Sequence, residues 1–286
     1  MSSHHYLEAV TVCVNYADIL AETVPANRAH LDRWLIVTSP DDRATLDLCH
    51  KHNLEAVVTR DFYRDGDDFN KGRGIERGLG MLAHRDWLVH LDADIALPAC
   101  FRESLDDADI DPVCIYGADR LLVQGWDAWQ QLKAKGWLRR GWHCCVASNG
   151  YPVGTRWADI RYGYVPIGYF QLWNQAADHR EGIRLRRYPD NHQNAARADV
   201  KFALQWDRRQ RQLLPEVLVA HLESEPAENG KNWNGRKTKP FGPTSENHTF
   251  GPKPEHLKVV SAGTPATDAE WWPHHHDHHH PHWPVS

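Results

Sequence analysis

Two aspartates, Asp92 and Asp94, directly follow the apolar segment Trp87–Leu91. Residues two apart on a strand point the same way, so both carboxylates are expected to face one site. Such a pair suits a hard divalent cation, Mn²⁺ or Mg²⁺, that also binds a diphosphate. The preceding apolar segment favours this interpretation over the alternative, a pair of capping or solvated aspartates. Spacing alone decides nothing, because Asp-x-Asp also begins at Asp65, Asp107 and Asp109.

The elements that position these carboxylates follow from alternating strand and helix patterns in the first hundred residues. Apolar, β-branched segments predict strands at residues 10–16, 34–38, 54–59 and 87–91. Helical patterns cover residues 18–33, interrupted at Pro25, residues 44–53, and a segment from about Asn70 with Ile75, Leu79, Leu82 and Ala83 on one face. This alternation predicts a parallel sheet with crossover helices, whose ligands bind beyond the carboxyl ends of the strands.

The pattern changes after about Pro98. Residues 101–180 are rich in Trp, Tyr and Gly and have weak periodicity, whereas a helix is expected at 199–212 and a strand at 216–221. The last segment, 262–286, is expected to be a disordered tail, with seven histidines between His274 and His282. Such a tract can chelate transition metals, but nothing packs around it to fix a geometry, so we interpret it as non-catalytic.

The composition excludes several classes of protein. The 286 residues carry a formal net charge of −5, whereas histone-like and ribosomal proteins need a large excess of cations. With 41% hydrophobic and 25% charged residues, the chain can bury a core. No apolar segment approaches the ~20 residues of a membrane span, and Met1–Val10 lacks the layout of a signal peptide. We therefore expect a cytoplasmic protein with six reduced cysteines and no membrane partner.

A family resemblance rests on two adjacent segments, Phe69–Leu79 and Asp86–Pro98. They resemble the nucleotide-sugar half of GT-A glycosyltransferases of the family-2-like and galactosyltransferase-like groups, closely over residues 8–100 and more loosely over 160–240. The resemblance implies an α/β fold, GT-A, with a Rossmann-like, mostly parallel sheet, flanking helices and an irregular C-terminal half. It divides the chain into a nucleotide-sugar-binding half (1–100), an acceptor-binding and donor-closing half (101–261) and the tail.

The resemblance also implies roles for particular residues. The metal ligands would be Asp92, Asp94 and His221, with Asp92 also near the ribose. The nucleotide pocket would contain Asn15, Tyr16, Ser39, Asp41, Asp42 and Asp61, and the diphosphate would face Asn70 and Lys71. A cation at a helix start is by itself an anion site, although a surface lysine is the alternative for Lys71. For His221 the alternative is a satisfied core or surface histidine.

Two further roles are implied in the second half. The basic segment Lys231–Lys239 resembles a donor-closing loop, with Lys231, Trp233 and Arg236 over the donor, or else it is a solvated loop. Asp199 resembles the aspartate that deprotonates the acceptor in inverting galactosyltransferase-like enzymes, although this chain lacks their Glu-Asp pair. An N-cap or first-turn carboxylate is the alternative. If Asp199 is a cap, a retaining route is open, or the base is Asp159 or Asp178.

Together these features predict a metal-dependent glycosyltransferase, hexosyl or pentosyl, that uses a nucleoside-diphosphate sugar. The hydroxyl acceptor would be a glycan, a small molecule or a hydroxymethylated DNA base of the kind that viral enzymes glycosylate. The DNA option rests on basic clusters at 184–187, 208–211 and 231–239, for which solvated helix faces are the alternative. One alternative is a sugar nucleotidyltransferase, which usually has a Gly-rich basic loop after its first strand, where this chain has Asn15–Asp18. Another is a non-catalytic carbohydrate- or nucleic-acid-binding protein.

Overall fold

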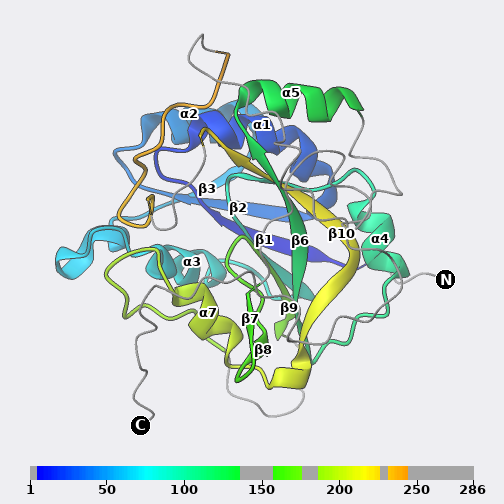
Figure 1. Cartoon of the computed structure of the whole chain (residues 1–286). Coiled ribbons are helices and arrows are strands. Elements are labelled where there is room, and N and C mark those ends of the chain that lie inside the picture. Colours follow the sequence, from blue (N-terminus) through cyan, green and yellow to red (C-terminus); the bar gives the residue numbers. More distant parts are fainter. Residues whose placement is uncertain (1–4, 136–156, 176–185, 226–230, 244–286) are drawn as a thin grey trace.

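The computed structural model describes residues 5–135, 157–175, 186–225 and 231–243. One sheet of eight strands has the order β3-β2-β1-β4-β9-β6-β10-β5, and β7 and β8 form a separate pair (Figure 1). The strands are β1 (Leu7–Val12), β2 (Arg33–Thr38), β3 (Glu55–Val58), β4 (Trp87–Leu91), β5 (Ile95–Ala96), β6 (Ile115–Gln124), β7 (Ala158–Asp159), β8 (Gly163–Tyr164), β9 (Phe170–Asn174) and β10 (Arg211–Glu223). The α-helices are α1 (Ala17–Asn27), α2 (Arg43–His52), α3 (Lys71–Leu79), α4 (Phe101–Asp107), α5 (Trp126–Lys135) and α7 (Ala198–Ala203).

Helices cover both faces of the sheet, because its central strands are apolar on both sides. In β1, Leu7 and Ala9 pack with residues of α1, α2 and α4, whereas Val10 and Val12 pack with α3 and α7. Figure 1 shows α1 and α2 on one side of the strands and α3 and α7 on the other. The prediction of an α/β fold with a mostly parallel sheet and flanking helices is confirmed.

The second half of the chain completes the same sheet. β9 lies antiparallel between β4 and β6, β10 runs parallel to β6, and the short β5 pairs with β10. Besides the expected strand at 216–221, which lies within β10, the second half contributes β6 and β9, which no sequence pattern predicted. Their pairing partners are distant in sequence, so local periodicity does not reveal them.

Several expected boundaries hold and others are wrong. The strands at 34–38, 54–59 and 87–91 and the helix at 44–53 match β2, β3, β4 and α2 within one or two residues. The first strand is β1, three residues before the expected start, and the chain leaves it before Asn15, which has a φ of 62°. Helix α1 contains Pro25 but ends at Asn27, and a short 3-10 helix, Arg28–His30, follows it. The buried Asn27 side chain bonds the backbone of Ile95 and Leu97.

The later helices are shorter than expected. Helix α3 ends at Leu79, so Leu82 is buried in the turn that follows and Ala83 is exposed. The expected helix 199–212 is wrong beyond Ala203, since Arg211 already belongs to β10, which pairs with β6 through a register shift between Leu213 and Leu218.

Asp178, Cys144, Cys145 and the tail 262–286 lie outside the described residues. Within the described part, no helix is long and apolar enough to cross a membrane.

Candidate active site

The Asp-x-Asp sequence forms the turn between β4 and β5, at the carboxyl ends of the parallel strands. The Asp92 N–H donates to the carbonyl of Tyr169 at 3.0 Å, and the Asp94 carbonyl accepts from the Leu222 N–H at 2.8 Å. The turn is thus fixed by β10 and by the residue that precedes β9. Both aspartate side chains are 21% exposed, so ligands can reach them.

The Asp92 carboxylate contacts two side chains, Lys71 and His90. Its Oδ1 lies 2.5 Å from Lys71 Nζ and 3.2 Å from His90 Nε2. Burial raises the pKa of the Asp92 carboxyl, but the Lys71 ammonium and His90 outweigh it and hold the pKa well below its usual range. Burial lowers the pKa of Lys71, and the carboxylates of Asp92, Asp94 and Asp199 raise it above its ordinary value. The site therefore contains an ionised Lys71–Asp92 pair, and Lys71 is not the surface lysine of the alternative interpretation.

Asp94 offers one free oxygen. Its Oδ2 lies 3.3 Å from His221 Nε2, whereas its Oδ1 is buried and has no partner among the described residues. Carboxylate and imidazole together suit Mn²⁺. The described residues contain no group of three or more His, Cys, Asp or Glu side chains arranged for a metal. One or two protein ligands completed by substrate phosphate and water are nevertheless a usual arrangement for such ions, so the residues fit a cation shared with a diphosphate.

Asp199 is placed by α7 and by the loop before β9. The N-cap of α7 is Arg197, with a φ of 72°, and no side-chain capping bond is formed there among the described residues. Asp199 is therefore not the N-cap, but it does lie in the first turn of α7, as the other form of the alternative expects. Its Oδ2 accepts from the Gly168 N–H at 2.7 Å. A Cβ at Gly168 would lie 2.6 Å from the Asp199 Cβ, so this approach requires glycine. The carboxylate is positioned by a distant backbone amide and contributes to the charge environment of Lys71.

A buried hydrogen-bonded chain that the sequence did not reveal underlies these carboxylates. Tyr188 Oη donates to Gln171 Oε1 at 2.9 Å and lies 3.2 Å from His90 Nδ1. Gln171 Nε2 donates to the carbonyls of Pro166 and Asp199 at 2.8 and 3.1 Å. The chain connects the backbone of Asp199 to the His90 that contacts Asp92. The only available sequence signal was a polar residue, Gln171 or His90, inside an apolar strand.

Around β1 and β2, the expected nucleotide-pocket residues gather at the carboxyl ends of the strands, but several have other partners. Asp42 is buried, caps α2 through the Thr45 N–H at 3.1 Å and accepts from the Asn15 N–H at 2.6 Å. Asp41 is exposed and pairs with Arg60 at 3.2 Å. Asp42 thus supports the loop, while the exposed Asn15 and Asp41 can be reached by a ligand.

The other members of the expected pocket also have local contacts. The Ser39 hydroxyl accepts from the Asp41 N–H at 3.4 Å, and Asp61 lies 3.7 Å from Arg64. Asn70 is fully buried and caps α3, with its Oδ1 accepting from the Arg73 N–H at 3.1 Å. Its amide also donates at 3.0 Å to Asp67 and at 2.8 Å to the Asp190 carbonyl, so no polar atom of Asn70 is left to face a diphosphate.

The segment Lys231–Lys239 lies against the loop after β1. The Arg236 guanidinium forms a bidentate pair with Asp18, donates to the Asn15 carbonyl at 2.8 Å, and lies 4.6 Å from the centre of the Tyr16 ring. Burial and nearby Asp94 raise the pKa of Tyr16 well above its usual range. Arg236 thus anchors the segment rather than presenting a free cation to a donor.

Lys231 and Trp233 are placed differently. Lys231 lies 2.8 Å from Glu225, and its ammonium lowers the pKa of that carboxyl through a hydrogen bond. The Trp233 carbonyl accepts from the Ala195 N–H at 2.9 Å, while the residue is 43% exposed. The exposed indole is available to a ligand. The side chain of Asp159 lies outside the described part.

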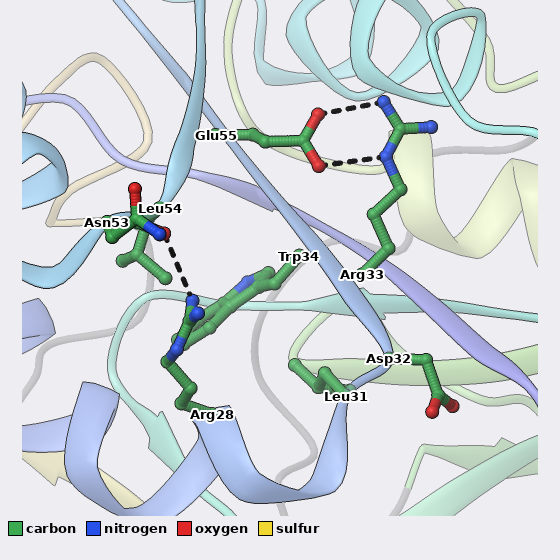
Figure 2. A pocket seen from close by; sticks show the side chains of 8 residues that line it. All are labelled: Arg28, Leu31, Asp32, Arg33, Trp34, Asn53, Leu54 and Glu55. Atoms are coloured by element: carbon green, nitrogen blue, oxygen red, sulfur yellow. Dashed lines mark hydrogen bonds and ion pairs between the residues drawn. The ribbon is translucent and has the colours of Figure 1, made fainter.

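A pocket of about 330 Å³ lies elsewhere, between the starts of β2 and β3 (Figure 2). Figure 2 shows Arg33 paired in a fork with Glu55, at 2.8 and 3.0 Å. Because β2 runs parallel to β1 and β4, this pocket is at the amino ends of the strands, opposite to Asp92 and Asp94. Its charged side chains already have partners, and it contains none of the expected site residues.

No protein-family model matches the chain, and no curated protein does. Among solved structures, it is similar to mannosyl-3-phosphoglycerate synthase from Rubrobacter xylanophilus, with 20% identity over 42% of this chain and 41% of that one and a TM-score of 0.34. It is also similar to glucosyl-3-phosphoglycerate synthase from Mycobacterium tuberculosis in complex with Mn²⁺, UDP-glucose and phosphoglyceric acid. That match has 11% identity, covers 76% of this chain and 71% of that one, and has a TM-score of 0.44. The chain spans less than half the length of the first structures that it matches.

Proposed function

We propose that the protein is a metal-dependent GT-A glycosyltransferase that moves a sugar from a nucleoside-diphosphate sugar to a hydroxyl acceptor. The observation that carries this proposal is the free, buried Oδ1 of Asp94 beside His221, with Lys71 and Asp199 at the same sheet edge. A bound cation would neutralise charge on the leaving diphosphate. Asp94 and His221 would hold that cation.

The remaining residues would orient the substrates. Asp92, fixed by Lys71 and His90, would bind the donor ribose, while Asn15, Tyr16 and Asp41 would contact the nucleotide. Lys71 would stabilise negative charge on the diphosphate, which requires it to share its ammonium between Asp92 and the phosphate. Asp199 keeps one carboxylate oxygen on the Gly168 N–H and would use the other to accept the acceptor's proton, which gives an inverting displacement.

The two halves of the chain would have different binding roles without being separately folded domains. Residues 1–100 would bind the nucleotide sugar, and residues 101–261 would bind the acceptor and close over the donor, although strands from both halves belong to one sheet. For the acceptor, we favour a glycan or small molecule over DNA. Three of the arginines behind the DNA hypothesis have partners within the protein: Arg186 lies over Trp206, Arg187 lies 3.5 Å from Glu76, and Arg208 donates to the Ile160 carbonyl.

The test is release of nucleoside diphosphate from a panel of nucleotide sugars, UDP-glucose among them, with Mn²⁺ and with EDTA. We expect one donor to be cleaved with Mn²⁺ only. Asp94→Asn should lower this rate at least a hundredfold, because it removes the charge of a ligand while keeping its shape. The matched control is Asp109→Asn, from another Asp-x-Asp sequence on the surface, which should leave the rate unchanged.

Other results would contradict the proposal. Full activity in EDTA would refute the metal-dependent mechanism. Pyrophosphate as the product from a sugar phosphate and a nucleoside triphosphate would indicate a nucleotidyltransferase. Binding of the donor without any cleavage, with and without candidate acceptors, would indicate a non-catalytic binding protein.

A further inference from the structure

Arg120, on β6, is a half-buried cation that has no carboxylate partner among the described residues. Its guanidinium lies 4.3 Å from the centre of the Tyr169 ring, and its Nη1 lies 3.2 Å from His221 Nδ1. Its Nε is buried and without a hydrogen-bond partner in the described part of the chain. An arginine side chain stays charged in a protein, so the fold maintains a cation without a counter-charge next to the candidate metal site.

The contact with Arg120 determines which ring nitrogen of a neutral His221 carries the proton. A guanidinium only donates, so His221 Nδ1 must accept, and a neutral His221 then carries its proton on Nε2, 3.3 Å from Asp94 Oδ2. A histidine that binds a metal through Nε2 has its proton on Nδ1 instead. In that state Nδ1 cannot accept from Arg120. The hydrogen bond between Arg120 and His221 and metal ligation by His221 therefore exclude each other.

We propose that Arg120 is an anion-binding residue of this site, released from His221 when His221 ligates the metal, and that its ligand is a phosphate or carboxylate group of a substrate. The inference rests on the proposed metal site. Arg120 contacts Nδ1 and Asp94 contacts Nε2 of the same His221 ring, so one imidazole ring would separate the guanidinium from the candidate metal site. The Tyr169 face supports the guanidinium, and its planar fork matches phosphate and carboxylate oxygens.

The proposal predicts opposite effects on two ligands. Removing the Arg120 charge removes a contact to the anion, and it also removes the hydrogen bond that competes with metal binding at His221. Anion affinity should therefore fall, while metal affinity without the anion should stay the same or rise. A merely structural role for Arg120 would loosen the site and weaken both.

The experiment compares wild type with Arg120→Met and with the control Arg28→Met. Arg28 is an exposed arginine at the amino ends of the strands, with one hydrogen bond to the Asn53 carbonyl at 3.3 Å. Mn²⁺ affinity is measured by electron paramagnetic resonance without any anion. Pyrophosphate affinity is then measured by calorimetry at saturating Mn²⁺, and inorganic phosphate affinity on the complex saturated with Mn²⁺ and pyrophosphate.

In Arg120→Met we expect one of the two anion affinities to fall about 10- to 100-fold, as for a lost charge-assisted hydrogen bond, with no loss of Mn²⁺ affinity. A fall for pyrophosphate assigns Arg120 to the donor diphosphate, and a fall for inorganic phosphate assigns it to an anionic acceptor. Unchanged affinities for both anions, or a parallel loss of Mn²⁺ affinity, would overturn the proposal. If the Met variant does not fold, Arg120→Lys tests the same point, because it keeps the charge but loses the fork and should lower anion affinity less.

Donor cleavage by the wild type separates this inference from the proposed function. Cleavage of a nucleotide sugar, combined with anion binding that does not depend on Arg120, leaves the function standing and the inference wrong. Anion binding that depends on Arg120 and on Mn²⁺, without cleavage of any donor, leaves the inference standing and the glycosyltransferase proposal wrong.

Discussion

Replacing Asp199 distinguishes a general base from a structural carboxylate. In the structure, one of its oxygens accepts from the buried Gly168 N–H at 2.7 Å, and the side chain does not cap α7. Asp199→Asn keeps an oxygen that can accept this hydrogen bond but cannot take up a proton. Asp199→Ala removes both functions. The two variants therefore differ in stability but should be alike in catalysis.

The expected magnitudes follow from these contacts. In Asp199→Ala the buried Gly168 amide loses its acceptor, which costs about 1–3 kcal/mol of unfolding free energy. In Asp199→Asn the loss should stay below about 1 kcal/mol, because a neutral hydrogen bond replaces a charge-assisted one. A general base contributes roughly 10²–10⁴-fold to the rate, so both variants should transfer sugar at least about a hundred times more slowly.

The assay combines denaturant unfolding, donor affinity and the rate of sugar transfer on the same purified proteins. The control is Asp207→Asn, because Asp207 does form a capping box, with Gln210, at the start of the short helix Arg208–Gln210. It should change stability slightly and transfer not at all. Transfer by Asp199→Asn within a few-fold of the wild type would refute the role of Asp199 as base. Loss of donor affinity together with transfer would show instead that Asp199 shapes the donor site.

Two further predictions concern positioning and pH. Gly168→Ala places a Cβ 2.6 Å from the Asp199 Cβ, so we expect the free energy of unfolding to fall by about 1–3 kcal/mol. The rate of sugar transfer should fall as well, because Asp199 is displaced. A wild-type rate of transfer would show that the loop moves away without cost. Burial lowers the pKa of His30 from 6.5 to about 4, so between these pH values only the unfolded chain gains the proton. Unfolding free energy should thus fall by up to about 3 kcal/mol as pH drops through this window. In urea titrations at several pH values, His30→Asn should lack this pH-dependent part of the unfolding free energy. A variant with the pH dependence of the wild type would contradict the assignment to His30.

Local patterns predicted the first part of the fold well. β4 and the turn at Asp92 are encoded by an apolar segment followed by polar residues, and α2 by Asp42 and the periodic residues after it. The second half was not predictable in this way. The place of β9 and β6 in the sheet depends on partners up to a hundred residues away, and the end of the helix predicted at 199–212 instead enters β10, where Arg211 pairs with Ile115 of β6.

The site was partly predictable for a related reason. Residue type and spacing predicted carboxylates that the fold does bring to one edge of the sheet, but they did not show which polar side chains are helix caps. Asn70 and Asp42 are residue types that often bind phosphate or ribose, yet their side chains cap α3 and α2. Arg120 and Gly168 could not be found at all, since their importance depends on His221 and Asp199, which are distant in sequence.

The three carboxylates at this sheet edge have the same chemistry in the sequence and different partners in the structure. Asp92 faces the Lys71 ammonium, so its charge is balanced within the protein and it is suited to orienting a neutral hydroxyl. Asp94 faces an imidazole and keeps a buried oxygen free, so it is suited to a cation. Asp199 has one oxygen on a backbone amide, which fixes its direction without neutralising it, and this is what a base requires. The division of roles that we propose therefore depends on one lysine, one histidine and one glycine, and exchanging any of these partners should alter the role of the carboxylate beside it.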